Sequence, residues 1–462
     1  MLCPDRLGSH MAGTGIRCWE LAKVLAGRHT VTIAATQVAP EFTRETSDVH
    51  GIQVLGAPVS AVRLAGMVAN HDIVYLQGQS HTWVPLSLLR QPGKHVVVDL
   101  TCPFPLEDLA VAATPLGAGE AGVFQATLAG LRRQLLLGDF FLAAHERQRD
   151  FWLGMLLALG RIQPAVARHD SALEQLITVV PYGVPSQPPR RIGPGLRDTV
   201  PSIGPHDQVL YLGGGLHPWL DLGTPLRAMA MLAVRHPEVK LVFLAPAVSS
   251  RPAGKVATER ALGLAHSLGV LDRSVFAHRE WVPYAQRADY LLDAAAGLSC
   301  HPPTLETRFS FRIRVLDYLW AGLPVITTEG DYFAELVTTK RLGLVVPPGE
   351  PQALARAIVD VLAKTSGDKA LASRMRSVAT NFQWLRVAQP LLDYCDSPQQ
   401  AADKFTPAWQ RSVGSLPASL PPIRPWRMLQ QAIHSLRETG TSATYRRTRR
   451  WLSQRLGAGR DR

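Results

Sequence analysis

The run ETRFSFRIRVLDYLWAGLPVITTEGDYFAE, residues 306–335, gives the strongest indication of the fold. Cationic residues gather around a short polar turn, and a helix is expected to begin where they end. Backbone N–H groups at a helix N-terminus and fixed guanidinium groups act together on an anion such as a diphosphate. Gly322 suits a left-handed helix cap, and Pro324 directs the chain into an apolar strand. The run therefore predicts half of a nucleotide-binding unit whose diphosphate ligands are Arg308, Ser310, Arg312 and Arg314.

This run resembles the donor-binding element of the retaining glycosyltransferases of family 4, which have the GT-B fold. The common form of that element has a Glu, a Gly-Phe-Gly loop, a second Glu eight residues after the first, and an Ala/Cys-Gly-Leu-Pro-Val-Ile turn. Asp317 lies where the second Glu is expected, and the residue eight positions earlier is Phe309, which is not an acid. The nearest candidate for the first Glu is Glu306, which implies a lengthened loop.

The Arg-rich loop and the Leu-Asp-Tyr-Leu-Trp helix are similar to a subgroup of bacterial enzymes that build surface polysaccharides, and the resemblance extends to about Asp403. It implies a hexosyltransferase-like enzyme that moves a sugar from a nucleotide-sugar donor to a saccharide or a lipid-linked saccharide acceptor. Retention of the anomeric configuration is implied by the resemblance alone.

Length and composition fit two globular domains. The chain has 462 residues, of which 46% are hydrophobic and 19% charged, and a single core rarely exceeds about 250–300 residues. No run reaches the roughly 18 uncharged apolar residues of a membrane helix, and no secretory signal is recognised. The five cysteines are scattered and lack metal-site spacing, so reduced thiols in a cytoplasmic protein are expected.

Alternating apolar runs and helical patterns predict an α/β fold with two doubly wound, Rossmann-like domains that face a cleft. A Pro-, Gly- and Arg-rich segment divides the chain. The expected parts are an acceptor-side domain (1–185), a linker (186–205), a nucleotide-sugar-binding domain (206–380), a helix that crosses back to the first domain (381–403), and a basic amphipathic tail (404–462). The expected strands are 31–34, 73–76, 95–100, 140–143, 176–180, 209–212, 239–244, 275–277, 297–300 and 325–327.

Each domain has a glycine cluster where a strand is expected to end. Gly13 and Gly15 precede the first long helix and resemble the first glycine-rich loop of GT-B enzymes; the alternative is a turn that serves chain reversal alone. The strand before them is expected to be confined to residues 1–4, so we expect either a start a few residues late or a stunted first strand. The second cluster, expected to contact the donor, consists of Gly213, Gly214 and Gly215.

Two cations of the family pattern are absent near the second cluster. Gly215 replaces the usual Arg, and residues 219–221 lie where a Lys is common. An unneutralised diphosphate is costly in a partly desolvated site, so the three arginines of the later loop are expected to take over its neutralisation. The alternative is that some of them form salt bridges with Glu306 or Asp317.

Two further residues are candidates for contacts to the nucleotide. Asp317, in the first turns of the expected helix, can accept both ribose hydroxyls, or it is a helix charge that faces water. Trp281 follows an expected strand and either frames the base or packs in the core.

The sequence predicts transfer without a metal or a cofactor, the nucleotide-sugar being a substrate. It has no His/Cys/Asp cluster with metal-site spacing and no Asp-x-Asp after an expected strand. Arginines and helix-end amides can stabilise a departing diphosphate. No general base is singled out; the catalytic candidates are Glu306 and two polar residues at strand ends, Asp99 and His145, for which capping is the alternative.

The C-terminal residues 423–462 hold ten arginines and two acids, a net charge of +8 out of +12 for the chain. Apolar residues recur there at helical spacing, which is typical of an element that lies on an anionic membrane surface. A disordered solubilising tail is the alternative, and no nucleic-acid-binding fold signature accompanies the charge. We therefore expect a cytoplasmic enzyme at the inner face of the cell membrane, with no nucleic-acid partner. Two other functions stay open: a sugar-nucleotide epimerase of similar fold, and a non-catalytic assembly scaffold.

Overall fold

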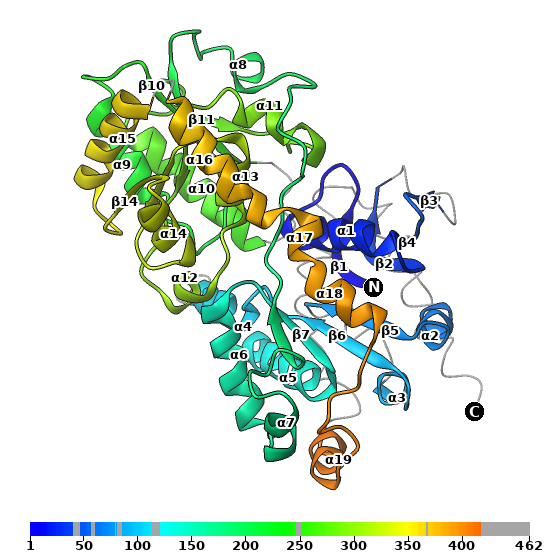
Figure 1. Ribbon diagram of the computed structural model, residues 1–462. Coiled ribbons are helices and arrows are strands. Elements are labelled where there is room, and N and C mark those ends of the chain that lie inside the picture. The colour runs from blue at the N-terminus through cyan, green and yellow to red at the C-terminus, as the bar shows by residue number, and fades with distance from the viewer. Residues whose placement is uncertain are drawn as a thin grey trace, which may run out of the picture.

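The computed structural model describes residues 1–39, 47–56, 61–78, 80, 86–112, 121–245, 252–365 and 368–416. They form two sheets, each flanked by helices, and the two units lie side by side (Figure 1). The predicted α/β class with two Rossmann-like domains is confirmed.

The first sheet has eight strands in the order β3-β4-β2-β1-β5-β6-β7-β8. All neighbouring strands are parallel except β3 and β4. The strands are β1 (Leu2–Leu7), β2 (Val31–Val38), β3 (Ser47–Val49), β4 (Ile52–Gly56), β5 (Ile73–Gln77), β6 (His95–Asp99), β7 (Phe140–Ala143) and β8 (Ile177–Val179). The helices are α1 (Gly13–Ala26), α2 (Ala61–Ala69), α3 (Leu86–Leu89), α4 (Phe104–Ala112), α5 (Ala121–Leu137), α6 (Glu146–Ala158) and α7 (Pro164–His169).

The expectation of a stunted first strand is wrong. Strand β1 has six residues and lies between β2 and β5. Its register shifts between Cys3 and Arg6, and the Arg6 amide donates to the Asp5 carboxylate, so the strand continues past Pro4 through a local irregularity. Helix α1 follows so closely that a Cβ on Gly15 would lie 2.4 Å from the Arg6 carbonyl oxygen. Gly13 and Gly15 therefore lie within the first turn of α1, not before it.

The second sheet has six parallel strands in the order β11-β10-β9-β12-β13-β14. Its strands are β9 (Gln208–Leu212), β10 (Val239–Leu244), β11 (Val275–His278), β12 (Ala296–Ser299), β13 (Val325–Thr328) and β14 (Gly343–Val346). Its helical segments are α8 (Leu196–Thr199), α9 (Gly223–Leu232), α10 (Pro252–Ser267), η3 (Tyr284–Gln286), α11 (Arg287–Leu291), α12 (Leu305–Phe309), α13 (Ile313–Ala321), α14 (Tyr332–Lys340), α15 (Pro351–Thr365) and α16 (Lys369–Ala379). Gly322 caps α13 with a φ of 72°, as the sequence predicts.

The segment between the two sheets packs on the second domain. The Asp289 carboxylate on α11 accepts from the Ile192 amide at 2.6 Å. Asp293 forms an ion pair with Arg191 and accepts from the Arg197 amide at 3.1 Å. Backbone and side-chain contacts thus order much of the 186–205 segment.

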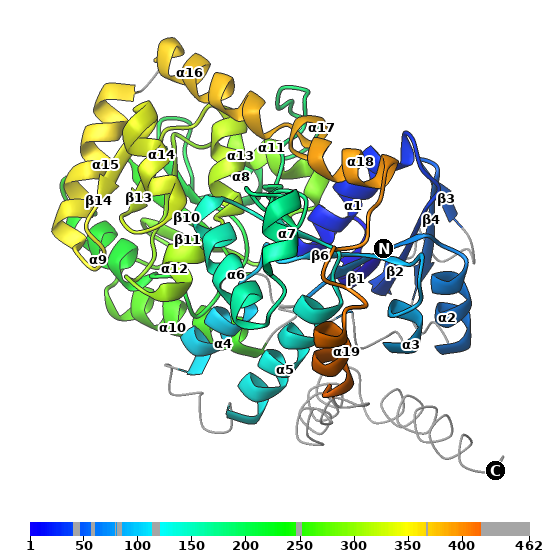
Figure 2. The ribbon, with the colours of Figure 1, turned by 60° about the horizontal axis from the view of Figure 1, so that its bottom comes forward.

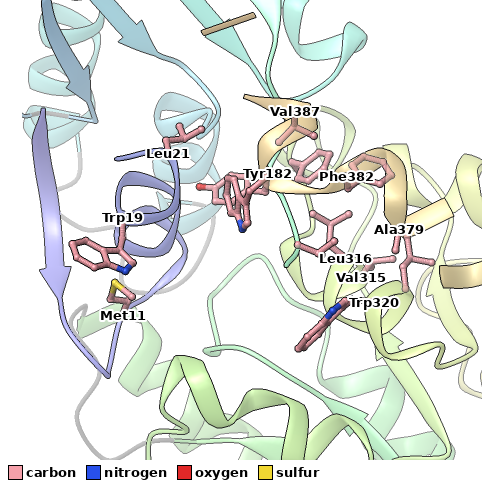
Figure 3. Packing of buried hydrophobic residues seen from close by; sticks show 14 of the residues in the cluster. Met11, Trp19, Leu21, Tyr182, Val315, Leu316, Trp320, Ala379, Phe382 and Val387 are labelled. Atoms are coloured by element: carbon pink, nitrogen blue, oxygen red, sulfur yellow. The ribbon is translucent and has the colours of Figure 1, made fainter. Parts of the chain in front are cut away.

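The chain crosses back to the first domain after α16. Val184 donates to the Phe382 carbonyl at 2.7 Å, and the Trp384 amide donates to the Val184 carbonyl at 3.1 Å, so the two crossings are directly hydrogen-bonded. The segments that follow are η4 (Thr380–Phe382), α17 (Trp384–Val387) and α18 (Gln389–Asp396), which lie beside α1 (Figure 1). One buried hydrophobic cluster contains Trp19 and Leu21 of α1, Leu316 of α13, and Phe382 at the crossing (Figure 3).

Residues after the crossing are anchored on the first domain. Lys404 is buried 2.6 Å from the Asp139 carboxylate, and Arg161 contacts Asp403. The indole of Trp409 in α19 (Pro407–Gly414) donates to the Leu136 carbonyl of α5 at 2.8 Å, which places α19 beside α5 (Figure 2). Residues 404–416 therefore pack on the first domain and do not begin a tail. Residues 417–462, which include the basic segment 423–462, lie outside the described residues.

Candidate functional site

The second glycine cluster lies at the carboxyl end of β9 and is held by α13. The Tyr318 hydroxyl accepts from the Gly213 amide at 3.1 Å and lies 2.9 Å from the Tyr211 carbonyl and 3.0 Å from that of Leu298. Gly214 is exposed and has a φ of 79°, a conformation in which a side chain would be strained. Tyr318 thus ties an exposed glycine loop to strands β9 and β12.

Arg314 lies against this glycine loop. Its Nη2 is 3.7 Å from the position that a Cβ on Gly214 would occupy. Its Nη1 is buried and makes no hydrogen bond to the described residues. Burial lowers the pKa of Arg314, and the neighbouring charge of Arg312 lowers it further. A buried donor atom without a hydrogen-bond partner is costly, and an anion at the loop would relieve that cost.

Arg312 is engaged in a buried ion pair with Glu306. Its Nη1 and Nη2 donate to the two carboxylate oxygens at 2.8 and 2.7 Å. The Ser310 hydroxyl donates to the same carboxylate at 2.6 Å, and the Asp331 carboxylate lies 3.8 Å from the Arg312 Nε. For Arg312 the structure therefore shows the salt bridge that the sequence leaves open as an alternative, and it brings Glu306, Ser310 and Arg312 into one cluster.

Arg308 takes a different position from the other two arginines. It is exposed near the end of α12, and its guanidinium carbon is 5.5 Å from the centre of the Phe309 ring. Among the three predicted arginines, Arg314 is thus the one for which the described residues show a position at the glycine loop.

Asp317 pairs with a residue that the sequence does not single out. The Arg287 Nε donates to its carboxylate at 3.0 Å, and the Asp317 side chain keeps 28% of its surface exposed. Arg287 lies over the rings of Tyr284 and Trp320, at 3.9 and 4.7 Å from their centres. Trp281 is half-buried in the segment after β11.

The first domain meets this site through its own glycine cluster. A Cβ on Gly13 would lie 2.7 Å from Cδ1 of Ile313, the first residue of α13. Nearby in the chain, the Tyr284 amide donates to the Ser9 carbonyl at 2.8 Å. The N-terminal turn of α1 and the N-terminus of α13 are therefore in contact, as a site between two domains requires.

His145 links the two domains. It caps α6 by accepting from the Gln148 amide, and its Nε2 donates to the Phe309 carbonyl at 3.2 Å. Its ring stacks on that of Tyr332, with centres 5.2 Å apart. Gln148 donates to the Phe309 carbonyl at 3.0 Å and to the Thr101 carbonyl at 3.0 Å. Burial lowers the pKa of His145 to about 4, so the neutral ring serves here as a cap and an interdomain donor.

Asp99 is buried within the first domain. It accepts from Arg17 Nε at 2.6 Å and from Gln77 Nε2 at 3.3 Å, and the Tyr75 hydroxyl donates to it as well. Arg17 also donates to the Val180 carbonyl at 2.8 Å. The described contacts make Asp99 the centre of a network that ties α1 to strands β5 and β6.

The described residues contain no group of three or more His, Cys, Asp or Glu side chains that could hold a metal ion. A helix long and apolar enough to cross a membrane is likewise absent from the part of the chain that the structure describes.

Comparisons with known proteins agree with this architecture. Residues 207–364 match the protein-family model described as Glycosyl transferases group 1. The chain is a glycosyltransferase of the GT-B fold. No curated protein sequence matches it.

Similar solved structures cover both domains. Sucrose-phosphate synthase from Thermosynechococcus elongatus has 15% identity and a TM-score of 0.63, over 85% of this chain and 97% of that one. HepE from Anabaena, solved with UDP-glucose, has 15% identity and a TM-score of 0.60, over 85% and 100%. WaaG, a glycosyltransferase of lipopolysaccharide biosynthesis, has 16% identity and a TM-score of 0.56, over 86% and 99%. At these identities the likeness establishes the fold.

Sequence reasoning missed several residues that shape the site. Tyr318 could have been found from the sequence, because it lies one residue after Asp317 and one helical turn from Arg314. No sequence pattern indicates Arg287 or Gln148, since their partners lie 30 and 161 residues away in the sequence.

We expect Arg312→Ala to destabilise the second domain. The change leaves the Glu306 carboxylate buried without its bidentate partner, and breaking a buried pair in this way costs about 3–5 kcal/mol. The free energy of unfolding, measured by urea denaturation, should fall by that order, and the double variant Glu306→Gln with Arg312→Met should recover part of it. Equal stability of Arg312→Ala and the wild type would contradict a structural role.

Protonation of His145 should make the free energy of unfolding depend on pH. Its pKa is about 4 in the folded chain, against an ordinary value of 6.5, so between these values the unfolded chain binds a proton that the folded chain does not. Stability is thus lost as pH falls from about 6.5 towards about 4.

The variant His145→Asn keeps a capping oxygen and should flatten this part of the curve of unfolding free energy against pH. Urea titrations between about pH 4.5 and 7 provide the measurement. Curves of identical slope for the variant and the wild type would rule out the assigned protonation.

Proposed function

We propose that this glycosyltransferase moves a sugar from a nucleotide-sugar donor to a saccharide or a lipid-linked saccharide acceptor, with retention of configuration and without a metal. The observation that carries the proposal is the half-buried Arg314, which lies against the exposed Gly214 and whose buried Nη1 makes no hydrogen bond to the described residues. The structure of Anabaena HepE with UDP-glucose supports the choice of donor, because that protein has the same fold.

The departing nucleoside diphosphate is the group that this site would stabilise. Cleavage of the bond between the sugar and the phosphate leaves negative charge on the phosphate oxygen, and Arg314 together with the first amides of α13 would meet that charge. Preorganised donors of this kind act in the transition state without reorganising. Gly213, Gly214 and Gly215 would let the diphosphate approach the backbone closely.

The other proposed contacts to the nucleotide-sugar follow from this position of the diphosphate. Asp317, held by Arg287 and partly exposed, would accept the ribose hydroxyls, and Trp281 would lie beside the base. Gly13 and Gly15 would bring the first domain close to the donor sugar. Glu306 would act through the loop it braces, since both of its oxygens are bonded to Arg312.

We further propose a role in cell-surface polysaccharide biosynthesis, in the cytoplasm at the inner face of the membrane. Residues 423–462 carry a net charge of +8 with apolar residues at helical spacing. Such a segment suits an anionic lipid surface, where a lipid-linked acceptor would be found.

Arg314→Ala should weaken donor binding. Loss of a charge-assisted contact of about 1.5–3 kcal/mol corresponds to a roughly 10- to 100-fold increase in Kd. Titration calorimetry with UDP, GDP, ADP and dTDP would first identify the nucleotide, and the variant would then be compared with Arg308→Ala. That control removes the same charge from an exposed position and should bind like the wild type.

The outcomes separate the candidate functions. Absence of binding by the wild type for every nucleotide would favour a scaffold. Release of free nucleoside diphosphate from a sugar donor without any acceptor product would favour an epimerase. Unchanged affinity in Arg314→Ala would contradict the assigned diphosphate site.

Deletion of residues 423–462 should abolish association with anionic vesicles. Flotation with phosphatidylglycerol-containing vesicles measures this, and vesicles of phosphatidylcholine alone serve as the control, because attraction of a basic segment requires anionic lipid. Equal flotation of the full chain and the truncated chain would remove the proposed membrane role of the segment.

A further inference from the structure

One arginine is too little to neutralise a nucleoside diphosphate. In the described structure Arg312 is bound to Glu306, and Arg308 lies beside the Phe309 ring, which leaves Arg314 at the glycine loop. The loop itself supplies neither Lys nor Arg, because residues 213–226 read GGGLHPWLDLGTPL. His217 is the one basic residue in that run.

The position of His217 suits a contact with the same anion. A Cβ on Gly215 would lie 3.7 Å from His217 Nε2, just as a Cβ on Gly214 would lie 3.7 Å from Arg314 Nη2. Apart from these two groups and the adjoining residues of the chain, no heavy atom of the described residues lies within 4 Å of either Cβ position. Two nitrogen groups therefore flank the open side of adjacent glycines.

The His217 ring is held in place by Trp219, which in turn contacts His301. It stacks on Trp219 with ring centres 4.6 Å apart and an interplanar angle of 3°. The Trp219 carbonyl lies 3.4 Å from His301 Nδ1, and the Ser299 hydroxyl lies 3.0 Å from the other nitrogen of that ring. His301 is fully buried; burial, with the charges of Arg312 and Arg314, lowers its pKa well below the ordinary value. A neutral His301 thus supports the Trp219 platform.

We propose that His217 binds the diphosphate of the donor, as the partner of Arg314 and in place of the cation that this loop lacks. The proposal rests on the nucleotide-sugar function proposed above. Arg314 approaches from α13 and His217 from the glycine loop, so the anion is held from two elements of the second domain. Ring nitrogens can donate in the neutral and the protonated form, and stacking on Trp219 reduces the freedom lost on binding.

The test compares a nucleoside diphosphate with its nucleoside. UDP, GDP, ADP and dTDP are titrated into the wild type by calorimetry, and the one that binds is used with its parent nucleoside on three variants. His217→Ala should raise the Kd of the diphosphate about tenfold, the effect of one such contact, and leave that of the nucleoside unchanged. His217→Lys should restore the affinity for the diphosphate. His206→Ala changes an exposed histidine in the loop before β9 and should match the wild type.

Two results would overturn the assignment to His217 while leaving the proposed function intact. One is an unchanged diphosphate affinity in His217→Ala while Arg314→Ala loses binding. The other is an equal loss for the diphosphate and the nucleoside that Lys does not restore, which would mean that His217 only holds the loop. A wild type that binds no diphosphate at all would overturn the proposed function and, with it, this assignment.

Discussion

The buried ion pair between Glu306 and Arg312 fixes the loop on which the candidate site depends. Both Glu306 oxygens are used, at 2.8 and 2.7 Å, and Ser310 adds a third bond. Such a pair contributes little net stability compared with apolar packing, but its bidentate geometry is specific. Because it draws residues 306–312 together, α13 begins at Ile313 and Arg314 lies against the glycine loop.

The first domain is hydrogen-bonded to the same loop at the Phe309 carbonyl. The Phe309 carbonyl accepts from His145 and from Gln148, and Gln148 also donates to Thr101 of its own domain. The loop that places Arg314 is thus bonded on its other side to the first domain. Coupling between two sites is reciprocal. An anion that stabilises this arrangement of the loop must therefore also stabilise the contact between the domains.

Much of the fold could be predicted, because buried parallel strands are continuous apolar runs. Strand β7 has the predicted bounds, Phe140–Ala143. Strand β14 is not predicted by the sequence, because it begins at Gly343 and a glycine indicates a break in a strand. A Cβ on Gly343 would lie 1.9 Å from the Val325 carbonyl oxygen. Side-chain partners were harder to predict: Arg17 and Asp99 are 82 residues apart, and His145 and Phe309 are 164 apart. No local pattern encodes such pairs.

Arg314, the cation beside the glycine loop, belongs to helix α13 and not to the loop. A cation on the loop would move with the loop, but Arg314 belongs to α13, whose Tyr318 holds the Gly213 amide. Loop and cation are therefore positioned by the same helix, and the 3.7 Å approach of Arg314 to Gly214 depends on how α13 packs. Because the buried Leu316 and Leu319 fix that packing, the electrostatics of the site depends on the hydrophobic core beneath it.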